Sequence, residues 1–242
     1  MTRRDLVQRL MFGAGLLAAK GSRAAAPERS AVAGAGPLSP PRTGKIPVAF
    51  VVTNEATVID FAGPWEVFQD VHVEGRGTSM DEMMPFDLFT VSEHAQVLSA
   101  SGGLRIVPNY TFDAAPTPRV VVVGAQQGRT PAVYEWLRTK SRTADVTMSV
   151  CTGAFQLAGA GLLAGLEATT HHLYLDKLAK EFPDVKVLRG LRFVEGPRIS
   201  TAGGLTSGID LALRVVERYF GRTVAQGTAA YLEYQGTGWI VN

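Results

Sequence analysis

Cys151 is the only cysteine among the 242 residues, and its setting predicts a nucleophile. It follows the predicted buried strand 146–150 and precedes Thr152 and Gly153. A buried strand that runs into a glycine-assisted helix start predicts a nucleophile elbow, a strained turn that projects its side chain beside helix N–H groups. These groups stabilise a thiolate, the reactive form of cysteine, so we expect a lowered thiol pKa. The alternative is a buried cysteine that serves only as a small hydrophobic side chain.

Asp60 is the acid that we expect to act with this cysteine. It lies between apolar residues after the first predicted strand, where a helix begins. A carboxyl group that faces the thiol can carry protons to and from the reacting atoms, and one proton shared by the two groups suits acid–base chemistry. As the alternative, Asp60 is a helix N-cap or a turn former without a chemical role.

Two backbone positions and one hydroxyl complete the predicted site. Gly124 and Ala125 follow a buried strand, where backbone N–H groups can approach a ligand and stabilise developing charge. Thr152 offers a hydroxyl and an N–H group beside the sulfur. We expect Gly124 and Ala125, together with His171, to contact the substrate or an oxyanion, and Thr152 to act in catalysis with Cys151 and Asp60. Gly124, Ala125 and Thr152 each also fit an ordinary turn or helix start.

The histidines support a site less directly. His171 and His172 are adjacent, and in a strand they would point to opposite faces, so we do not expect them to share a metal ion. A Cys/His/acid triad built on His171 stays open, because spacing alone does not test it. His72 and His94 are expected at the surface. With a single cysteine, we expect neither an intrachain disulfide nor a multi-cysteine metal site.

The elements that must position these residues alternate between buried strands and helices, which predicts an α/β fold with a mainly parallel sheet covered on both faces. Ligand crevices in such sheets lie at the carboxyl ends of the strands. Asp60, Gly124 and Cys151 each follow a strand, so we expect them to converge. Strands are predicted over 48–52, 86–91, 120–123, 146–150, 185–188, 192–194 and 199–201, a hairpin or crossover over 97–111, and helices from Gly63-Pro64 and over 132–140, 153–160, 174–182, 207–220 and 223–234.

The first 26 residues differ from the rest and predict a twin-arginine signal peptide. Arg3 and Arg4 precede an apolar stretch over 10–19, and three alanines at 24–26 form a small-residue cleavage site. We therefore expect a periplasmic or secreted protein, with an amphipathic N-terminal helix as the alternative. Residues 27–45 are rich in Ala, Gly, Pro and Ser and predict a flexible linker, and residues 46–242 are expected to form one α/β domain.

The positive charge of the chain belongs to this first segment. The formal net charge is +2, but residues 1–26 hold five of the 24 Lys and Arg residues and one of the 22 Asp and Glu residues, so the remainder has a net charge of −2. The sequence has no basic stripe and no DNA-binding motif, and no apolar run reaches the roughly 18–20 residues of a membrane span. We expect no nucleic-acid partner, and no membrane association after removal of the signal.

Together, four segments resemble the ThiJ/PfpI superfamily, the single-domain relatives of the class I glutamine amidotransferases. The segments are 59–68, 149–154, 168–171 and 201–210, and they include Ile59-Asp60-Phe61-Ala62-Gly63-Pro64, Val150-Cys151-Thr152-Gly153 and Ala168-Thr169-Thr170-His171. Within the superfamily, the likeness is greatest to the isonitrile hydratases and to the sensor domains of AraC-type regulators. The resemblance covers about 46–234 and implies a flavodoxin-like three-layer sandwich, usually dimeric, with no cofactor.

The resemblance also implies residue roles. Cys151 matches the family nucleophile, Asp60 its acidic partner, and Thr152 the residue after the nucleophile. PfpI-type proteases carry His at that last position, so Thr152 argues against a peptidase. Two positions depart from the pattern, because His172 stands where Trp is often found and Ala125 stands where a second glycine is usual.

We therefore expect a cysteine-dependent lyase that hydrates an isonitrile to an N-substituted formamide, and that acts as a homodimer on a small molecule. A glyoxalase-like hydratase of small α-oxoaldehydes, which uses the same cysteine, is one alternative. A non-catalytic small-molecule-binding domain is another. Regulators of this branch carry a helix-turn-helix after the domain, and we expect none here.

Overall fold

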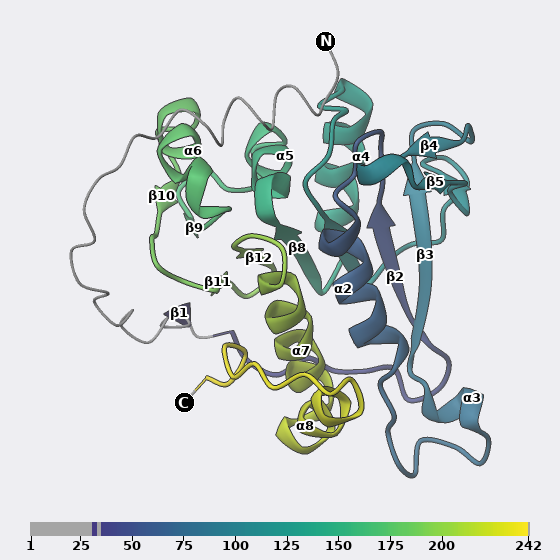
Figure 1. Cartoon of the computed structure of the whole chain (residues 1–242). Helices are drawn as coiled ribbons and strands as arrows, with labels where there is room; N and C mark the ends of the chain where they lie inside the picture. Colours follow the sequence, from purple (N-terminus) through teal and green to yellow (C-terminus); the bar gives the residue numbers. More distant parts are fainter. Residues whose placement is uncertain (1–30, 33–34, 242) are drawn as a thin grey trace.

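The computed structural model describes residues 31–32 and 35–241, which are organised around an eight-stranded sheet (Figure 1). The strand order is β1-β11-β12-β8-β7-β2-β3-β6, and every neighbouring pair is parallel except β11 with β12. The predicted signal peptide, residues 1–26, lies outside the described residues. The predicted α/β class, with a mainly parallel sheet between helical layers, is confirmed.

The strands of this sheet are β1 (Ala31–Val32), β2 (Ile46–Val51), β3 (Phe86–Ser92), β6 (Tyr110–Thr111), β7 (Val120–Val123), β8 (Val146–Val150), β11 (Phe193–Glu195) and β12 (Ile199–Ala202). Two small pairs lie beside it, β4 (Leu98–Ser99) with β5 (Arg105–Ile106) and β9 (Glu167–Ala168) with β10 (Lys186–Val187). The helices are α2 (Val58–Gln69), α3 (Met80–Met83), α4 (Pro131–Ser141), α5 (Ala154–Gly159), α6 (Leu175–Glu181), α7 (Ser207–Phe220) and α8 (Arg222–Tyr231).

Both faces of the sheet are covered, which explains the continuous apolar runs. Val48 and Phe50 of β2 pack in one core with residues of α2, α7 and α8. Ala49 and Val51 of the same strand pack in a second core with residues of α4, α5 and α6. Because successive strand residues point to opposite faces, a strand between two helical layers needs an apolar side chain at every position.

Helix α2 begins earlier than the sequence predicts. The helix was expected to open at Gly63, with Pro64 in its first turn, but it begins at Val58 and Pro64 lies inside it. Proline lacks the N–H that would bond to the Asp60 carbonyl four residues back, so the helix loses that hydrogen bond. The earlier start places Asp60 in the first turn of α2, not in the turn before it.

The other predicted elements lie close to their predicted bounds, and β7, β8 and α7 match them. The hairpin predicted over 97–111 is the antiparallel pair β4–β5, turned by Ser101–Gly103. Helix α3 and the short strands β6 and β9 were not predicted. None of the helices in the described part of the chain combines the length and the hydropathy that a membrane span requires.

The part of the predicted linker at residues 35–45 is held against the domain by arginine side chains. Arg218, Arg119 and Arg76 donate to backbone carbonyl oxygens of this segment over 2.8 to 3.1 Å. The Leu38 N–H also donates to the Arg218 carbonyl at 2.7 Å. A charged guanidinium forms stronger hydrogen bonds than a neutral donor, so this segment is a docked strap and not a free linker.

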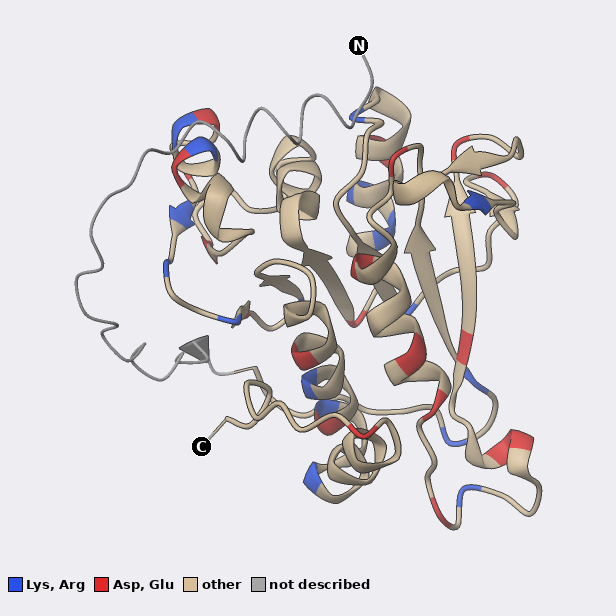
Figure 2. Cartoon of the chain, viewed as in Figure 1, with Lys and Arg blue, Asp and Glu red and all other residues tan. Residues whose placement is uncertain are grey.

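Buried charges gather at the edge of the sheet opposite to the carboxyl ends of β7 and β8. Glu195, fully buried at the end of β11, lies 3.1 Å from Arg214 Nε and 3.7 Å from Arg218 Nε. Figure 2 shows the acidic and basic positions that follow one another along α7, which supplies both arginines. Asp145, just before β8, pairs at 2.6 Å with Arg119.

Candidate functional site

Cys151 lies on the strained turn that the sequence predicts. It follows β8 directly and has a φ of 57°, in the left-handed region that side chains other than glycine rarely adopt. Its N–H donates to the Gly203 carbonyl at 2.7 Å, and its carbonyl accepts from Thr170 Oγ1 at 2.8 Å. These two bonds hold the turn, which has the geometry of a nucleophile elbow.

Glycine is needed beside this turn because the chain passes close to β7. A Cβ on Gly153 would overlap the carbonyl oxygen of Val123. A Cβ on Gly124, just after β7, would lie 2.8 Å from the Asp60 Cβ. Gly124 therefore provides the space in which the carboxyl group of Asp60 approaches the cysteine turn.

Asp60 is fully buried, and its carboxyl group points toward Cys151 from the first turn of α2. Its Oδ2 accepts the Ala125 N–H at 3.0 Å, and the Ala125 carbonyl accepts the Thr57 N–H at 2.8 Å. The end of β7 thus fixes the start of α2 by two hydrogen bonds. The predicted convergence of Asp60, Gly124 and Cys151 is confirmed.

Burial governs the protonation of this pair. It raises the pKa of Asp60 to about 6, against the lowering effects of the Ala125 N–H, the Cys151 thiol and the Leu205 N–H. Burial, and next the Asp60 charge, raises the pKa of Cys151 to about 12. The N–H groups of Thr152 and Leu205 lower the thiol pKa, as expected for a turn into a helix, but less than burial raises it. The predicted net lowering of the thiol pKa is therefore wrong for the resting protein.

At neutral pH the resting pair is accordingly a carboxylate beside a thiol. The contacts from the Cys151 thiol and the Leu205 backbone do not give Asp60 Oδ1 a hydrogen bond of ordinary geometry, and this buried atom has no partner. A buried acceptor without a partner is costly, of order 1 to 3 kcal/mol. The arrangement therefore suits a base that takes the thiol proton when a substrate arrives.

The predicted oxyanion contacts are only partly available. The Ala125 N–H is already bonded to Asp60, so it orients the acid and does not point at a substrate. Thr152 is half-buried next to the sulfur, and its N–H acts on the thiol. Leu205, which the sequence analysis did not single out, supplies an N–H that acts on both Asp60 and Cys151.

Leu205 has a φ of 54°, so it is a second strained residue beside the cysteine. The segment 203–205 carries two of the features that hold the site, the Gly203 carbonyl and the Leu205 N–H. Its Gly-Gly pair was visible in the sequence as part of a family-like segment, but no residue type there indicates hydrogen bonding to the site. A leucine in the left-handed region gives no signal in the sequence.

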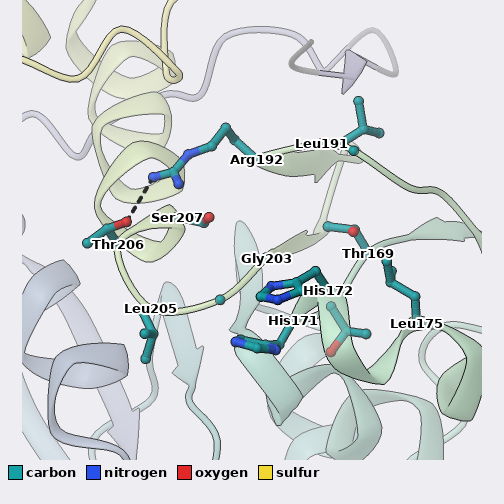
Figure 3. Close-up of a pocket in the computed structure, with 13 residues that line it drawn as sticks. Thr169, His171, His172, Leu175, Leu191, Arg192, Gly203, Leu205, Thr206 and Ser207 are labelled. Atoms are coloured by element: carbon teal, nitrogen blue, oxygen red, sulfur yellow. Dashed lines mark hydrogen bonds between the residues drawn. The ribbon is translucent and has the colours of Figure 1, made fainter. Parts of the chain in front are cut away.

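His172 begins a short 3₁₀ turn, His172–Tyr174, and His171 is its N-cap, so neither lies in a strand, and their rings stack with centroids 4.4 Å apart. The expectation that they point to opposite faces is therefore wrong. Both line a hollow of about 280 Å³ beside the cysteine turn, together with Arg192 and Thr206 (Figure 3). The hollow shares Thr170, Gly203 and Leu205 with the surroundings of Cys151, but neither Cys151 nor Asp60 lines it.

No group of three or more His, Cys, Asp or Glu residues in the described part of the chain is arranged to hold a metal ion. His72 and His94 lie away from the site, His72 beside Met80 and His94 beside Glu93. The residues that the structure brings together are Asp60, Gly124, Ala125, Cys151 and Thr152, with His171 at the adjoining hollow.

Comparison with known proteins places this geometry in a family. Residues 47–218 match the DJ-1/PfpI family model. The chain is 28% identical over 193 residues to an isonitrile hydratase of Pseudomonas putida, an alignment that covers 77% of this chain and 78% of that protein. It is 36% identical over 140 residues to the HTH-type transcriptional regulator CdhR of Pseudomonas aeruginosa, which covers 53% of this chain but only 41% of the regulator.

Solved structures agree with the fold. A ThiJ/PfpI family protein from Pseudomonas syringae has a TM-score of 0.68 and 26% identity, over 81% of this chain and 78% of that one. DJ-1beta of Drosophila melanogaster has a TM-score of 0.65 at 14% identity, over 79% of this chain and all of that one. At this low identity, the second likeness concerns the fold alone.

Proposed function

The chain belongs to the DJ-1/PfpI family, and on that premise we propose that it is a cysteine-dependent hydratase that converts an isonitrile to an N-substituted formamide. The observation that carries the proposal is the buried Asp60 carboxyl group beside Cys151, with a pKa of about 6 and no cation within its hydrogen-bonding contacts. The similarity to an isonitrile hydratase over most of both chains supports this choice of substrate.

In the first half of the reaction, the cysteine adds to the terminal carbon of R–N≡C. Asp60 takes the thiol proton as the sulfur attacks that carbon, and the same proton is then delivered to the carbon. A C–S and a C–H bond form, and the product is the thioimidate R–N=CH–S–Cys151. A carboxyl group whose pKa lies near the working pH both accepts and donates this proton readily.

In the second half, water adds to the thioimidate carbon. Asp60 accepts a proton from the attacking water and passes it to the nitrogen, which gives R–NH–CH(OH)–S–Cys151 and returns Asp60 to the carboxylate. The C–S bond then breaks, the hydroxyl proton leaves, and the sulfur is protonated again through Asp60. The products are R–NH–CHO and the free thiol, so each turnover consumes one isonitrile and one water molecule. The N–H groups of Thr152 and Leu205 are placed to stabilise negative charge at the sulfur.

The test is formamide production by the purified protein. In H₂¹⁸O, each turnover is expected to place one ¹⁸O atom in the formamide, and Cys151→Ala is expected to abolish turnover. Unchanged formamide production by Cys151→Ala would exclude the covalent route. A His94→Phe variant, altered at an exposed histidine away from the site, serves as the matched control and should keep full activity.

A ligand-binding domain without turnover is the second candidate. The similarity to a transcriptional regulator favours it, as does the small exposed fraction of Cys151, which is 7%. Saturable binding of an isonitrile, with no formamide after prolonged incubation, would select this candidate over the hydratase. An α-oxoaldehyde tested in the same assay, with lactate as the measured product of methylglyoxal, covers the glyoxalase-like alternative.

We further propose that residues 1–26 direct export by the twin-arginine route and that the protein acts as a homodimer. Replacement of Arg3 and Arg4 by lysine is expected to retain the protein in the cytoplasm of a host with that pathway. Analytical ultracentrifugation of the chain without residues 1–26 is expected to show twice the monomer mass. A monomer at micromolar concentration would contradict the second proposal.

A further inference from the structure

The hollow beside the cysteine turn is lined by hydrogen-bond donors and by no carboxylate. Its 13 lining residues include His171, His172, Arg192, Thr206 and Ser207, and none is Asp or Glu (Figure 3). The side chain of Arg192 pairs with Asp210 at 2.6 Å and donates to Thr206 Oγ1 at 3.3 Å, which holds the guanidinium in place. A cavity lined in this way complements a ligand that accepts hydrogen bonds.

The proton on His171 has a defined position. Its Nδ1 accepts the Leu173 N–H at 3.3 Å, so that nitrogen carries no proton, and in a neutral ring the proton is on Nε2. Burial, and next His172, lowers the pKa of His171, which favours the neutral ring. None of the described residues forms a hydrogen bond with Nε2. The His171 Nε2–H is therefore a donor available to a ligand.

His171 lies next to residues that contact the turn at Cys151. Thr170, the preceding residue, bonds to the Cys151 carbonyl at 2.8 Å. On the other side, the ring lies so close to Gly204 that a Cβ there would overlap Cδ2 and lie 3.1 Å from Nε2. Gly204 stands between Gly203 and Leu205, the two residues that contact Cys151 through the backbone. His171 thus lies where the hollow meets the cysteine turn.

We propose that this hollow binds the substituent of the substrate, that the preferred substituent ends in a carboxylate, and that His171 determines this preference through its Nε2–H. The inference rests on the proposed function for the identity of the reacting group, but not for the chemistry of the hollow. A volume of about 280 Å³ has room for a short substituent that ends in a carboxylate. The substrate class is then a small isocyano acid, whose carbon reaches Cys151 while its carboxylate meets His171, Arg192 and Thr206.

The test compares two isonitriles of similar size, isocyanoacetate and n-propyl isonitrile. The wild-type kcat/KM is expected to favour isocyanoacetate by about 10- to 100-fold, the range for hydrogen bonds to a charged group. His171→Phe keeps a ring against Gly204 but removes the donor, and is expected to lower this ratio by about tenfold. His171→Gln, which retains an N–H donor, is expected to preserve most of the ratio. Equal kcat/KM for the two substrates in the wild type would overturn the proposal.

A binding measurement separates this inference from the proposed function. Isothermal titration of Cys151→Ser with isocyanoacetate, and with its hydration product N-formylglycine, needs no turnover. Binding of both acids, weakened about tenfold or more by His171→Phe, would support the hollow even if no isonitrile is hydrated. Formamide production without acid preference would support the hydratase and exclude the carboxylate site. Should His171→Phe fail to fold, Thr206→Val removes a second donor, and an unchanged acid affinity in that variant would contradict the proposal.

Discussion

Two fully buried carboxyl groups, Asp60 and Glu195, lie at opposite edges of the same sheet and serve different purposes. Burial raises the pKa of both. Glu195 faces the guanidinium groups of Arg214 and Arg218, which act against that rise. Asp60 faces a thiol and backbone N–H groups, with no cation among its hydrogen-bonding contacts. The arginines at the Glu195 edge thus offset part of the cost of burying that charge, whereas the Asp60 edge supplies no cation and leaves the carboxylate available for proton transfer.

The same contrast holds for the backbone. At the Glu195 edge, Arg218 also donates to the carbonyl oxygens of Gly36 and Pro197. This arginine thus connects the buried Glu195 carboxylate, the docked strap of residues 35–45 and the sheet. At the Asp60 edge, Cys151 and Leu205 both have positive φ. Backbone strain and a buried charge without a counter-ion occur together at functional sites, where the surrounding structure maintains them. The comparison predicts that equivalent acid-to-amide substitutions will have opposite consequences at the two edges.

The largest expected effect is on activity. Asp60→Asn removes the proton carrier and is expected to lower kcat/KM for isonitrile hydration by about 10² to 10⁴, the usual contribution of a general acid–base group. Glu195→Gln makes the same chemical change at the other edge and is expected to leave kcat/KM within about twofold of wild type, because no general acid–base contribution is lost there. Initial rates of formamide formation measure both. A comparable loss of activity in the two variants would remove the functional distinction between the edges.

The next effect is on stability, and it reverses the order of the two residues. Glu195→Gln leaves Arg218 buried without its main counter-charge and Arg214 with Glu217 alone, and is expected to lower the free energy of unfolding by about 3 kcal/mol. Urea denaturation monitored by circular dichroism measures it. Glu135→Gln breaks an exposed pair with Arg138 on α4 and is the matched control, with an expected loss below about 1 kcal/mol. A loss equally small for Glu195→Gln would show that the buried cluster is not structural.

The third effect is a gain in stability that depends on pH. The pKa of Asp60 in the folded protein, about 6, lies above its ordinary value of 3.8. The folded state therefore binds more protons than the unfolded state between these values, and stability falls as the pH rises through this window. Asp60→Asn removes the penalty, so the variant is expected to be more stable than wild type by about 2 to 3 kcal/mol above pH 7.

Below about pH 4 this difference should disappear, because Asp60 is then protonated in both states. Unfolding free energies of the two proteins at pH 4 and pH 8 provide the comparison. A variant that is less stable than wild type at pH 8 would mean that the Asp60 charge is compensated in the folded protein. Asp60 would then resemble Glu195, and the two edges of the sheet would not differ as proposed.

Much of this arrangement could be predicted from the sequence because it depends on patterns that the sequence displays. The apolar run at 120–123 matches β7, and the segment 146–150, which has Val or Met at every other position, matches β8. A strand buried on both faces is typically a short run of this kind. The order of strands and helices then places Asp60 and Cys151 at one edge. Helix α2 was misplaced because Pro64 is typical of a first helical turn, whereas here the helix accommodates it inside.

The details that set the chemistry could not be predicted, because they depend on burial and on backbone direction. The direction of the Cys151 pKa shift follows from how deeply the turn is buried, which no local pattern records. The N–H of Ala125 is directed at Asp60 only because α2 starts at Val58. The docked strap depends on arginines far away in the sequence, such as Arg218, which donates to the Gly36 carbonyl. The composition of residues 27–45 gives no sign of these arginines.

The smallest expected effect isolates the strain at the reactive edge. Cys151→Ala and Cys151→Gly both remove the sulfur, but only glycine adopts a φ of 57° without steric cost. A left-handed conformation costs a side-chain-bearing residue about 1 to 2 kcal/mol, and the greater freedom of glycine in the unfolded chain offsets about 0.5 to 1 kcal/mol of the relief. Cys151→Gly is therefore expected to be more stable than Cys151→Ala by up to about 1 kcal/mol, measured as a difference in urea midpoint at constant slope. If the alanine variant is the more stable of the two, the turn is not strained. Its conformation would then be fixed only by the hydrogen bonds of residue 151 to Gly203 and Thr170.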